Sequence, residues 1–364
     1  MMYHNELAAI AKSNRTRTRR LFDETLIDFC SNDYLGFAQK KALFNRAVTQ
    51  VSMYKTHASK ASMVVNGYHP IHEEFESFLT RTNGFEAGLV CGSGFLANFS
   101  LIEALPRKRD VLILDEEYHA SGIVAAKRVD ATLLFFRHND ATHLEHLINT
   151  HTHNRVIIAV EGIYSMSGDV LNPEIFEVAD RYNAILIVDE AHSVGVLGEN
   201  LRGVFDHFGI TPKPNHIKMG TLGKALGSYG AYILCSEHIA SFLQNRAKAL
   251  IYTTAPSLFD IALGYQGFLY LLKNRAKIKA EIEQRQALLA RALGMSIEGL
   301  ICAYPLKEGV DALGVQRLLM EQGFLVGAIR PPTVEKPILR IIPQLGESLE
   351  SLESLCDVLK KGDV

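Results

Sequence analysis

Short apolar runs alternate with amphipathic stretches through the first two thirds of the chain. VLIL at 111–114, VIIAV at 156–160 and AILIV at 184–188 are apolar at every position. HPIHEEFESFLTRT at 69–82 instead has helical periodicity, with a proline in its first turn. Strands that are apolar on both faces belong to a sheet covered by helices on both sides. The pattern therefore predicts an α/β fold with a large, mainly parallel sheet.

The pattern changes after about residue 255. A long charged helix is expected over 273–293, and a mixture of short strands and helices follows it. The strands are expected near 300–306, 324–330 and 338–343, and the helices near 309–322 and 347–361. We predict three parts: an N-terminal arm over 1–40, a large α/β domain over 41–255, and a linking helix with a small C-terminal α+β domain over 256–364.

Composition and charge argue against several classes of protein. The 364 residues are 48% hydrophobic and 21% charged, as in ordinary globular proteins, and the net charge of −2 creates no field that attracts nucleic acid or an anionic membrane. No apolar run approaches the roughly 18 residues of a spanning helix, and the first 20 residues lack a signal-peptide core. The five cysteines have no paired spacing typical of a metal site. We expect a cytoplasmic protein with no metal, no nucleic-acid partner and no membrane partner.

One local charge feature stands out near the N-terminus. Arg15, Arg17, Arg19 and Arg20 form a basic run. Such a run is either a solvated arm or a patch for a phosphate-bearing substrate or a partner subunit.

Residues 189–192 read Asp-Glu-Ala-His, the acidic box of a nucleotide-driven helicase. A helicase also needs an upstream glycine-rich phosphate loop that ends in Gly-Lys-Ser or Gly-Lys-Thr. The only Gly-Lys pair, Gly223-Lys224, lies downstream of the box and is followed by Ala225. The sequence therefore disfavours a helicase and leaves Asp189 and His192 available for other chemistry at a strand end.

Several polar residues follow predicted strands, and in open α/β sheets ligands bind at the carboxyl ends of strands. Gly92-Ser93-Gly94 places a glycine turn before a helix, which suits a phosphate but is also common without one. Asp189 is either a helix cap or ion-pair partner, or an anion that keeps a heteroaromatic nitrogen protonated. His192 could donate to an oxygen on that ring and His119 could lie against it, although each histidine could equally be structural.

Lys224 lies among small residues in the segment TLGKALGS, 221–228. It is either a surface lysine or a Schiff-base lysine, whose amine needs a pKa lowered by burial and positive neighbours. Thr221 could bind the same phosphate as the glycine turn. A phosphate site, a ring-nitrogen acid, a ring-oxygen histidine and a lysine together indicate pyridoxal 5'-phosphate (PLP).

At these residues the chain resembles the α-oxoamine synthases, PLP enzymes that condense an amino acid with an acyl-CoA and release CO2. The resemblance runs through nearly the whole chain and implies a fold-type I PLP-dependent transferase. The motifs that carry it are CSNDYLGF (30–37), NGYHPIHEEFE (66–76), GSGFLAN (92–98), DEEYHASG (115–122), EGIYSMSGD (161–169), VDEAHSVGVLGENLRG (188–203), TLGKALGSYG (221–230), IYTTAPS (251–257) and IRPPT (329–333).

The resemblance implies roles for the residues at matching positions. Four are implied in catalysis: Lys224, which holds the cofactor and removes the substrate proton, His119, Asp189 and His192. Cofactor binding is implied for Gly94, Phe95, His119, Ser165, Asp189, His192, Thr221, Lys224, Thr253 and Thr254. Thr253 and Thr254 would reach the phosphate of a partner subunit, which implies a homodimer with a shared active site. Substrate binding is implied for Asn32, Thr333 and Arg340.

The substrates are less well defined than the cofactor. The motifs are most similar to those of the branch that joins L-alanine to a pimeloyl thioester in biotin biosynthesis. Two alternatives are another synthase of the family, using glycine or a long acyl chain, and a catalytically inactive partner subunit. The segment THASKASMVV at 56–65 departs from the family's glycine-rich pattern, so the acyl group and its carrier, CoA or a carrier protein, stay open.

Overall fold

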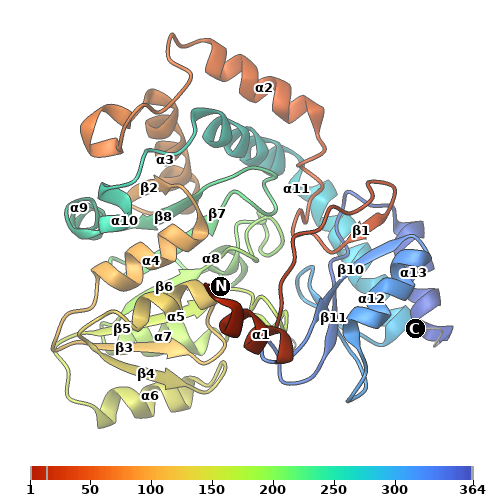
Figure 1. Cartoon of the computed structure of the whole chain (residues 1–364). Coiled ribbons are helices and arrows are strands. Elements are labelled where there is room, and N and C mark those ends of the chain that lie inside the picture. The colour runs from red at the N-terminus through yellow and green to blue at the C-terminus, as the bar shows by residue number, and fades with distance from the viewer. Residues whose placement is uncertain (1, 14, 362–364) are drawn as a thin grey trace.

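The computed structural model describes residues 2–13 and 15–361 and contains two sheets (Figure 1). The larger sheet has seven strands in the order β2-β8-β7-β6-β5-β3-β4. Their bounds are β2 (Ala87–Cys91), β3 (Val111–Asp115), β4 (Thr132–Phe136), β5 (Val156–Glu161), β6 (Ile185–Asp189), β7 (His216–Thr221) and β8 (Ala231–Cys235). In this sheet β8 runs in the opposite direction to the other six strands, which share one direction. This confirms the predicted α/β fold on a mainly parallel sheet.

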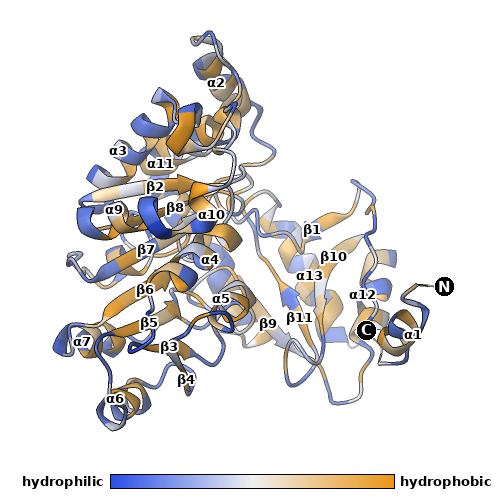
Figure 2. Ribbon diagram, turned by 60° about the vertical axis from the view of Figure 1, so that its left-hand side comes forward, coloured by the Kyte–Doolittle hydropathy of each residue, from blue (hydrophilic) through white to orange (hydrophobic). Residues whose placement is uncertain are grey.

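Helices cover both faces of this sheet (Figure 1). They are α2 (Lys41–Ser52), α3 (Pro70–Asn83), α4 (Gly94–Ala104), α5 (Ala120–Ala126), α6 (Ala141–Thr150), α7 (Glu174–Arg181), α8 (Val204–His207), α9 (Glu237–Arg246) and α10 (Lys248–Ile251). Alternate residues of one strand enter opposite cores: Leu186 and Val188 pack in one cluster and Ile187 in the other. The strands are accordingly hydrophobic along their length (Figure 2). Polar side chains on these strands are therefore confined largely to the strand ends.

The smaller sheet has four strands in the order β1-β10-β11-β9. These are β1 (Ile27–Phe29), β9 (Cys302–Pro305), β10 (Phe324–Ile329) and β11 (Ile338–Ile341), packed with α12 (Ala312–Glu321) and α13 (Leu349–Lys361). The elements after residue 300 lie close to their predicted positions. β1 was not predicted, because its three residues are too few to show a period; it pairs in parallel with β10, and Phe29 stacks on Phe324. The predicted domain boundaries stay a prediction.

Helix α11 (Leu258–Leu293) has 36 residues and is longer than the charged helix predicted over 273–293. Its first half is apolar and is interrupted by Gly264 and Gly267, so the charged periodicity begins only later. Gly264 is required by close packing, since a Cβ there would lie 2.9 Å from Leu222 Cδ1. α11 contacts α2 and α3 beside the large sheet and α13 beside the small one, and it therefore links the two sheets. The remaining elements are α1 (His4–Lys12) and the short π-helix η1 (Met63–Gly67).

Glu190, the acid that follows Asp189 in the helicase-like box, has a structural environment. Its side chain is fully buried and accepts hydrogen bonds from the Val204 N–H and the Ser193 hydroxyl. The ammonium of Lys218, in β7 and 1% exposed, lies 3.6 Å from Glu190 Oε1 and donates to the Arg202 carbonyl. Glu190 therefore anchors the loop after β6 and is not available to bind a nucleotide.

We expect Lys218→Met to destabilise the protein by about 3–5 kcal/mol, because the buried Glu190 carboxylate loses its cation. The free energy of unfolding, from urea denaturation, measures this. Lys279→Met is the matched control: it removes an ion pair with Glu199 at the surface and should change stability by less than about 1 kcal/mol. Equal stability of the two variants would show that the buried pair does not hold the loop.

Candidate active site

The carboxyl ends of the parallel strands meet at one edge of the large sheet. β2 leads to Gly94, β3 to His119, β5 to Ser165, β6 to Asp189 and His192, and β7 to Thr221 and Lys224. These are the residues predicted for the cofactor site, apart from Phe95, Thr253 and Thr254. The sheet therefore gathers side chains that are up to 130 positions apart, from Gly94 to Lys224.

Lys224, His192 and Tyr34 form a buried chain of hydrogen-bonding groups. The Lys224 amine lies 2.7 Å from His192 Nε2, and the Tyr34 hydroxyl lies 2.5 Å from His192 Nδ1. Burial, and then the charges of Lys224 and Arg340, hold the pKa of His192 well below its usual value. His192 is therefore uncharged at neutral pH. Tyr34 was given no role from the sequence, although it lies in the CSNDYLGF motif.

The pKa of the Lys224 amine lies closer to neutral pH than that of an ordinary lysine. Burial is the largest influence and lowers the pKa of Lys224 to about 8; Asp189 and Glu161 oppose the shift, and Arg340 adds to it. A lysine amine that is partly uncharged at neutral pH is a nucleophile and a base. The surface-lysine interpretation is wrong for this residue.

Asp189 is buried and has polar neighbours but no cation. Its Oδ2 accepts from Asn98 Nδ2 at 2.7 Å and its Oδ1 accepts from the Ala191 N–H at 2.9 Å. Asn98 is itself held by the Tyr118 hydroxyl at 2.7 Å. Over the described chain, no lysine, arginine or histidine lies within 4.0 Å of the Asp189 carboxylate. Such an anion fits a ligand that carries a protonated ring nitrogen.

The N-terminus of α4 lies beside Thr221. Gly94 is the first residue of the helix, and a Cβ at this position would be 3.8 Å from Thr221 Cβ. The Ser93 side chain caps the helix by accepting from the Leu96 N–H at 3.2 Å. The N–H groups of Gly94 and Phe95 belong to the first turn, where no intrahelical acceptor exists. Together with the Thr221 hydroxyl they form a site suited to a phosphate.

His119 caps the next helix, α5, and is linked to Asp189 through Ser121 and Asn98. Its Nδ1 lies 2.7 Å from the Ser121 hydroxyl, which also accepts from Asn98 Nδ2 at 3.1 Å. Burial lowers the pKa of His119, with Asp189 opposing this effect and Lys224 adding to it. An uncharged imidazole at this position is suited to contact with an aromatic ring.

Arg340, in β11 of the small sheet, reaches the loop that follows β5. Its Nε donates to the Ser165 carbonyl at 2.7 Å, and its Nη1 donates to Asn32 Oδ1 at 2.9 Å. Tyr34 donates to the same Asn32 oxygen at 3.3 Å, so this group joins the Lys224 chain. The structure thus brings together the predicted substrate residues Asn32 and Arg340. The recorded contacts use only two of the five guanidinium N–H donors, which leaves donors for a carboxylate.

Glu161 is a further buried acid that sequence reasoning passed over. It ends β5 directly opposite Asp189 of β6, and it is 1% exposed. Its Oε2 accepts from the Ser165 N–H at 3.2 Å, and its Oε1 has no hydrogen-bond partner among residues 2–13 and 15–361. Burial, followed by the charge of Asp189, raises the pKa of Glu161 well above its usual value, which favours its protonated form. Its place at a strand end, like that of Asp189, is the signal that could have revealed it.

Three predicted residues lie apart from this group. Thr253 and Thr254 lie between α10 and α11, and Thr333 lies in the turn between β10 and β11. Thr254 and Thr333 are exposed. Within the described chain, none of the three forms a hydrogen bond with the connected residues that we call the Lys224 group, which are Lys224, His192, Tyr34, Asn32 and Arg340. Their roles stay predictions.

The chain was compared with known proteins. Residues 24–359 match the family described as aminotransferase class I and II. The 8-amino-7-oxononanoate synthase of Helicobacter pylori is 42% identical over 98% of this chain and 96% of its own, and that of Saccharophagus degradans is 35% identical over 97% and 94%.

Solved structures match over nearly the whole chain. Serine palmitoyltransferase from S. paucimobilis, with bound PLP, has a TM-score of 0.88 at 21% identity and covers 99% of this chain and 96% of its own. The 8-amino-7-oxononanoate synthase of Francisella tularensis has a TM-score of 0.74 at 26% identity, over 94% and 100%. These matches confirm the predicted fold-type I architecture. Across residues 2–13 and 15–361, no helix is long and apolar enough to cross a membrane, and no cluster of three metal-ligating side chains occurs.

We expect the Lys224 amine of the cofactor-free protein to titrate near pH 8. Brief acetylation at a series of pH values, read by peptide mass spectrometry, measures this: labelling of Lys224 should reach half its maximum near pH 8 and fall at lower pH as the amine is protonated. Asp189→Asn should move the midpoint lower, because the aspartate charge raises the pKa of Lys224.

Lys279 provides an internal reference in the same samples, since its bond with Glu199 raises its pKa above the usual lysine value. If the labelling of Lys224 followed the same pH profile as that of Lys279, the expectation that burial lowers the pKa of Lys224 would be wrong.

Proposed function

The chain belongs to the aminotransferase class I and II family, and on that premise we propose that it is an 8-amino-7-oxononanoate synthase. The reaction joins L-alanine to a pimeloyl thioester, carried by CoA or a carrier protein, and releases CO2 and the thiol in the pathway to biotin. The observation that carries this proposal is the similarity to the Helicobacter pylori synthase over almost the full length of both chains. The complete Lys224 group argues against a catalytically inactive subunit.

The residues of the site fit PLP. The Gly94 and Phe95 N–H groups and Thr221 would hold its phosphate, the cation-free Asp189 carboxylate its ring nitrogen, and His192 its ring oxygen. His119 would lie against the ring and Ser165 beside it. Asp189 is the most telling member, since a buried carboxylate without a cation is costly unless a ligand supplies one.

When bound, PLP supplies an electron sink that lets bonds at the amino acid Cα break. Lys224 contributes an amine that is partly uncharged at neutral pH, so it can bond to an aldehyde carbon and accept the Cα proton. His192, held between Tyr34 and Lys224, stays uncharged and directs Nε2 toward the reacting amine. Asn98 keeps the Asp189 carboxylate in one orientation.

Arg340 and Asn32 would bind the carboxylate of the amino acid. Arg340 is 6% exposed and is fixed at Nε and Nη1, so its remaining donors have a defined direction. A planar guanidinium suits a carboxylate, which can accept two parallel hydrogen bonds. The carboxylate that Arg340 holds is the group lost as CO2. Thr333 would lie near the substrate.

A homodimer with a shared active site is part of the proposal. Thr253 and Thr254 would complete the phosphate site of the partner subunit. Tyr252, directly before them, is 81% exposed, and Val65 in the neighbouring η1 is 75% exposed. Large apolar side chains at this exposure are typical of a surface that another subunit covers.

We expect turnover of L-alanine with pimeloyl-CoA by the PLP-loaded protein, in which one CoA and one CO2 appear for each amino ketone. The test is to titrate the protein with L-alanine, glycine and L-serine while recording the cofactor absorbance, and then to add pimeloyl-CoA and measure thiol release. Lys224→Arg should lose turnover by at least about 10³-fold, since it removes the nucleophile and base.

An absorbance change with L-alanine but no thiol from pimeloyl-CoA would reject this acyl donor. Pimeloyl carrier protein and long-chain acyl-CoA, tested in the same assay, then decide between the carrier and the acyl group. Full turnover with glycine and another acyl-CoA would move the assignment to a different synthase of the family.

A further inference from the structure

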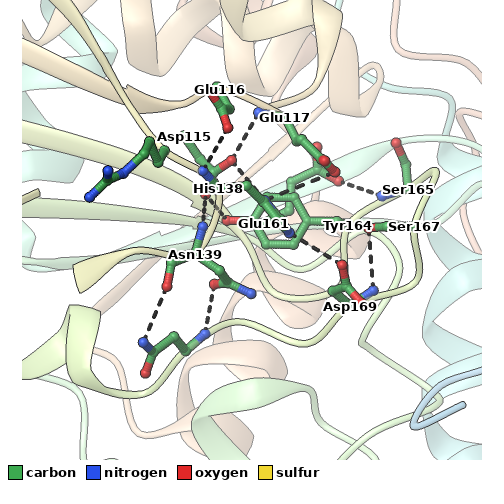
Figure 3. Close-up of polar contacts among 12 residues, drawn as sticks. Asp115, Glu116, Glu117, His138, Asn139, Glu161, Tyr164, Ser165, Ser167 and Asp169 are labelled. Carbon is green, nitrogen blue, oxygen red and sulfur yellow. Dashed lines mark hydrogen bonds and ion pairs between the residues drawn. The ribbon is translucent and has the colours of Figure 1, made fainter. Parts of the chain in front are cut away.

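A second polar cluster, centred on His138 just after the end of β4, surrounds the loop that follows β5 (Figure 3). His138 Nδ1 lies 3.0 Å from Asp115 Oδ1, and His138 Nε2 lies 3.3 Å from Asp169 Oδ2. Asp115 Oδ2 accepts from the Tyr164 hydroxyl at 2.8 Å. We call His138, Asp115, Tyr164 and Asp169 the His138 clamp.

The clamp holds both arms of one hairpin, residues 161–170, which carries the EGIYSMSGD motif. In the backbone, the Tyr164 N–H donates to the Asp169 carbonyl at 2.9 Å, and Ile163 bridges to Val170. In the side chains, His138 binds Asp169 on one arm directly and Tyr164 on the other arm through Asp115. His138 therefore fixes the width and orientation of the hairpin.

Ser165 lies at the end of this hairpin, directly after Tyr164. Its carbonyl accepts from Arg340 Nε at 2.7 Å and its N–H donates to Glu161 at 3.2 Å, so its peptide groups are held on both sides. Ser165 is 8% exposed and Arg340 is 6% exposed, so water does not readily replace this contact. Movement of the hairpin would thus be transmitted to the guanidinium of Arg340.

His138 carries a positive charge at neutral pH. The groups that face it are Asp115, Asp169, Glu117 at 3.9 Å, and the Tyr164 ring, whose centroid is 4.3 Å from that of His138. Burial lowers the pKa of His138, but the hydrogen bonds and charges of the carboxylates outweigh it and raise the pKa to about 10. An imidazolium donates at both ring nitrogens, as holding two carboxylates requires.

We propose that the His138 clamp positions Arg340 and thereby sets the affinity of the site for the carboxylate of the amino acid substrate. His138 is a positioning residue: it has no recorded contact with the Lys224 group and acts through Tyr164, Ser165 and Arg340. The proposal rests on the proposed function, in which Arg340 binds that carboxylate.

His138→Gln in the PLP-loaded protein tests the proposal. Glutamine keeps one donor nitrogen but lacks the positive charge and the second donor nitrogen of imidazolium. The hairpin should therefore loosen, and Arg340 should lose its fixed direction. We expect the KM for the amino acid, and its dissociation constant from the cofactor absorbance, to rise about tenfold. The KM for the acyl thioester and the affinity for PLP should change less than about twofold.

Two further variants grade the effect. Tyr164→Phe breaks only the bond to Asp115 and should raise the amino acid KM in the same direction. Asp169→Asn acts on an aspartate whose side chain is 57% exposed, so it folds even if His138→Gln does not, and it should show a smaller rise. His207→Gln, at an exposed histidine outside the clamp, is the control and should behave as wild type.

A pH series of melting temperatures tests the charge of His138 without any substrate. Because the folded pKa is raised, its stabilisation is complete below the unfolded value near 6.5 and is lost as pH rises through about 10. The melting temperature of His138→Gln should therefore fall furthest below wild type near pH 6, and the gap should narrow by pH 9.5.

The outcomes separate the two proposals. A normal amino acid KM and dissociation constant in the His138→Gln and Asp169→Asn variants, with a lower melting temperature, would show that the clamp is only structural and overturn this inference. A gap in melting temperature that did not change with pH would also overturn it. Absence of turnover with pimeloyl-CoA in wild type, while L-alanine still changes the absorbance and binds His138→Gln more weakly, would reject the proposed acyl donor and support the clamp.

Discussion

The site depends on one constraint, which is that the inner strands of the large sheet, β3, β5 and β6 among them, are buried on both faces. A polar side chain in the middle of β3, β5 or β6 would have to be placed in one of two apolar cores, at a cost of several kcal/mol without a partner. Polar side chains are therefore confined largely to the strand ends, with Lys218 of β7 as a paired exception, and parallel strands end at the same edge. Asp115, Glu161, Asp189 and Thr221 are the last residues of four such strands. The site and the His138 clamp thus follow from the same packing rule.

Charge at this edge is limited by the same burial. Glu161 and Asp189 end neighbouring strands in register, and two ionised carboxylates at that spacing would repel strongly. Burial and the charge of Asp189 raise the pKa of Glu161 and so favour its protonated form, while Asp189 keeps its polar contacts with Asn98 and Ala191. Nearby, burial holds the pKa of His192 well below its usual value, so His192 stays uncharged, and burial also lowers the pKa of Lys224 to about 8. The arrangement leaves Asp189 as the anion available to a cationic ring and Lys224 as an amine that can change its protonation.

The sequence predicted the parts of this arrangement that depend on local signals. The strands β3, β5 and β6, the glycine turn before α4, and the positions of Asp189, His192 and Lys224 all follow from short patterns, whereas β4 was not predicted. The structure confirms the α/β fold and brings Lys224 and His192 together, while the cofactor contacts of His119, Ser165 and Thr221 stay predictions. Missed features depend on distant partners: Tyr34 binds His192 across 158 positions, and β1 exists only because β10 pairs with it. No local pattern encodes such pairs, and Glu161 looked like the polar end of an ordinary strand.

The substrate end of the site differs from the cofactor end in how it is assembled. Apart from Thr253 and Thr254, the cofactor-side residues lie at or just after the ends of strands of one sheet, whose register fixes their spacing. Arg340 comes from the small sheet and Asn32 from the segment after β1, so their distance from Lys224 depends on how that sheet sits against the large one. Two contacts cross this junction near the site: Arg340 to the Ser165 carbonyl, and Tyr34 to His192. The hairpin that offers Ser165 is in turn held by His138. In the proposed arrangement, a side chain just after the edge strand β4 therefore influences how tightly the site holds the carboxylate of an amino acid, because it fixes the surface against which the small sheet places its arginine.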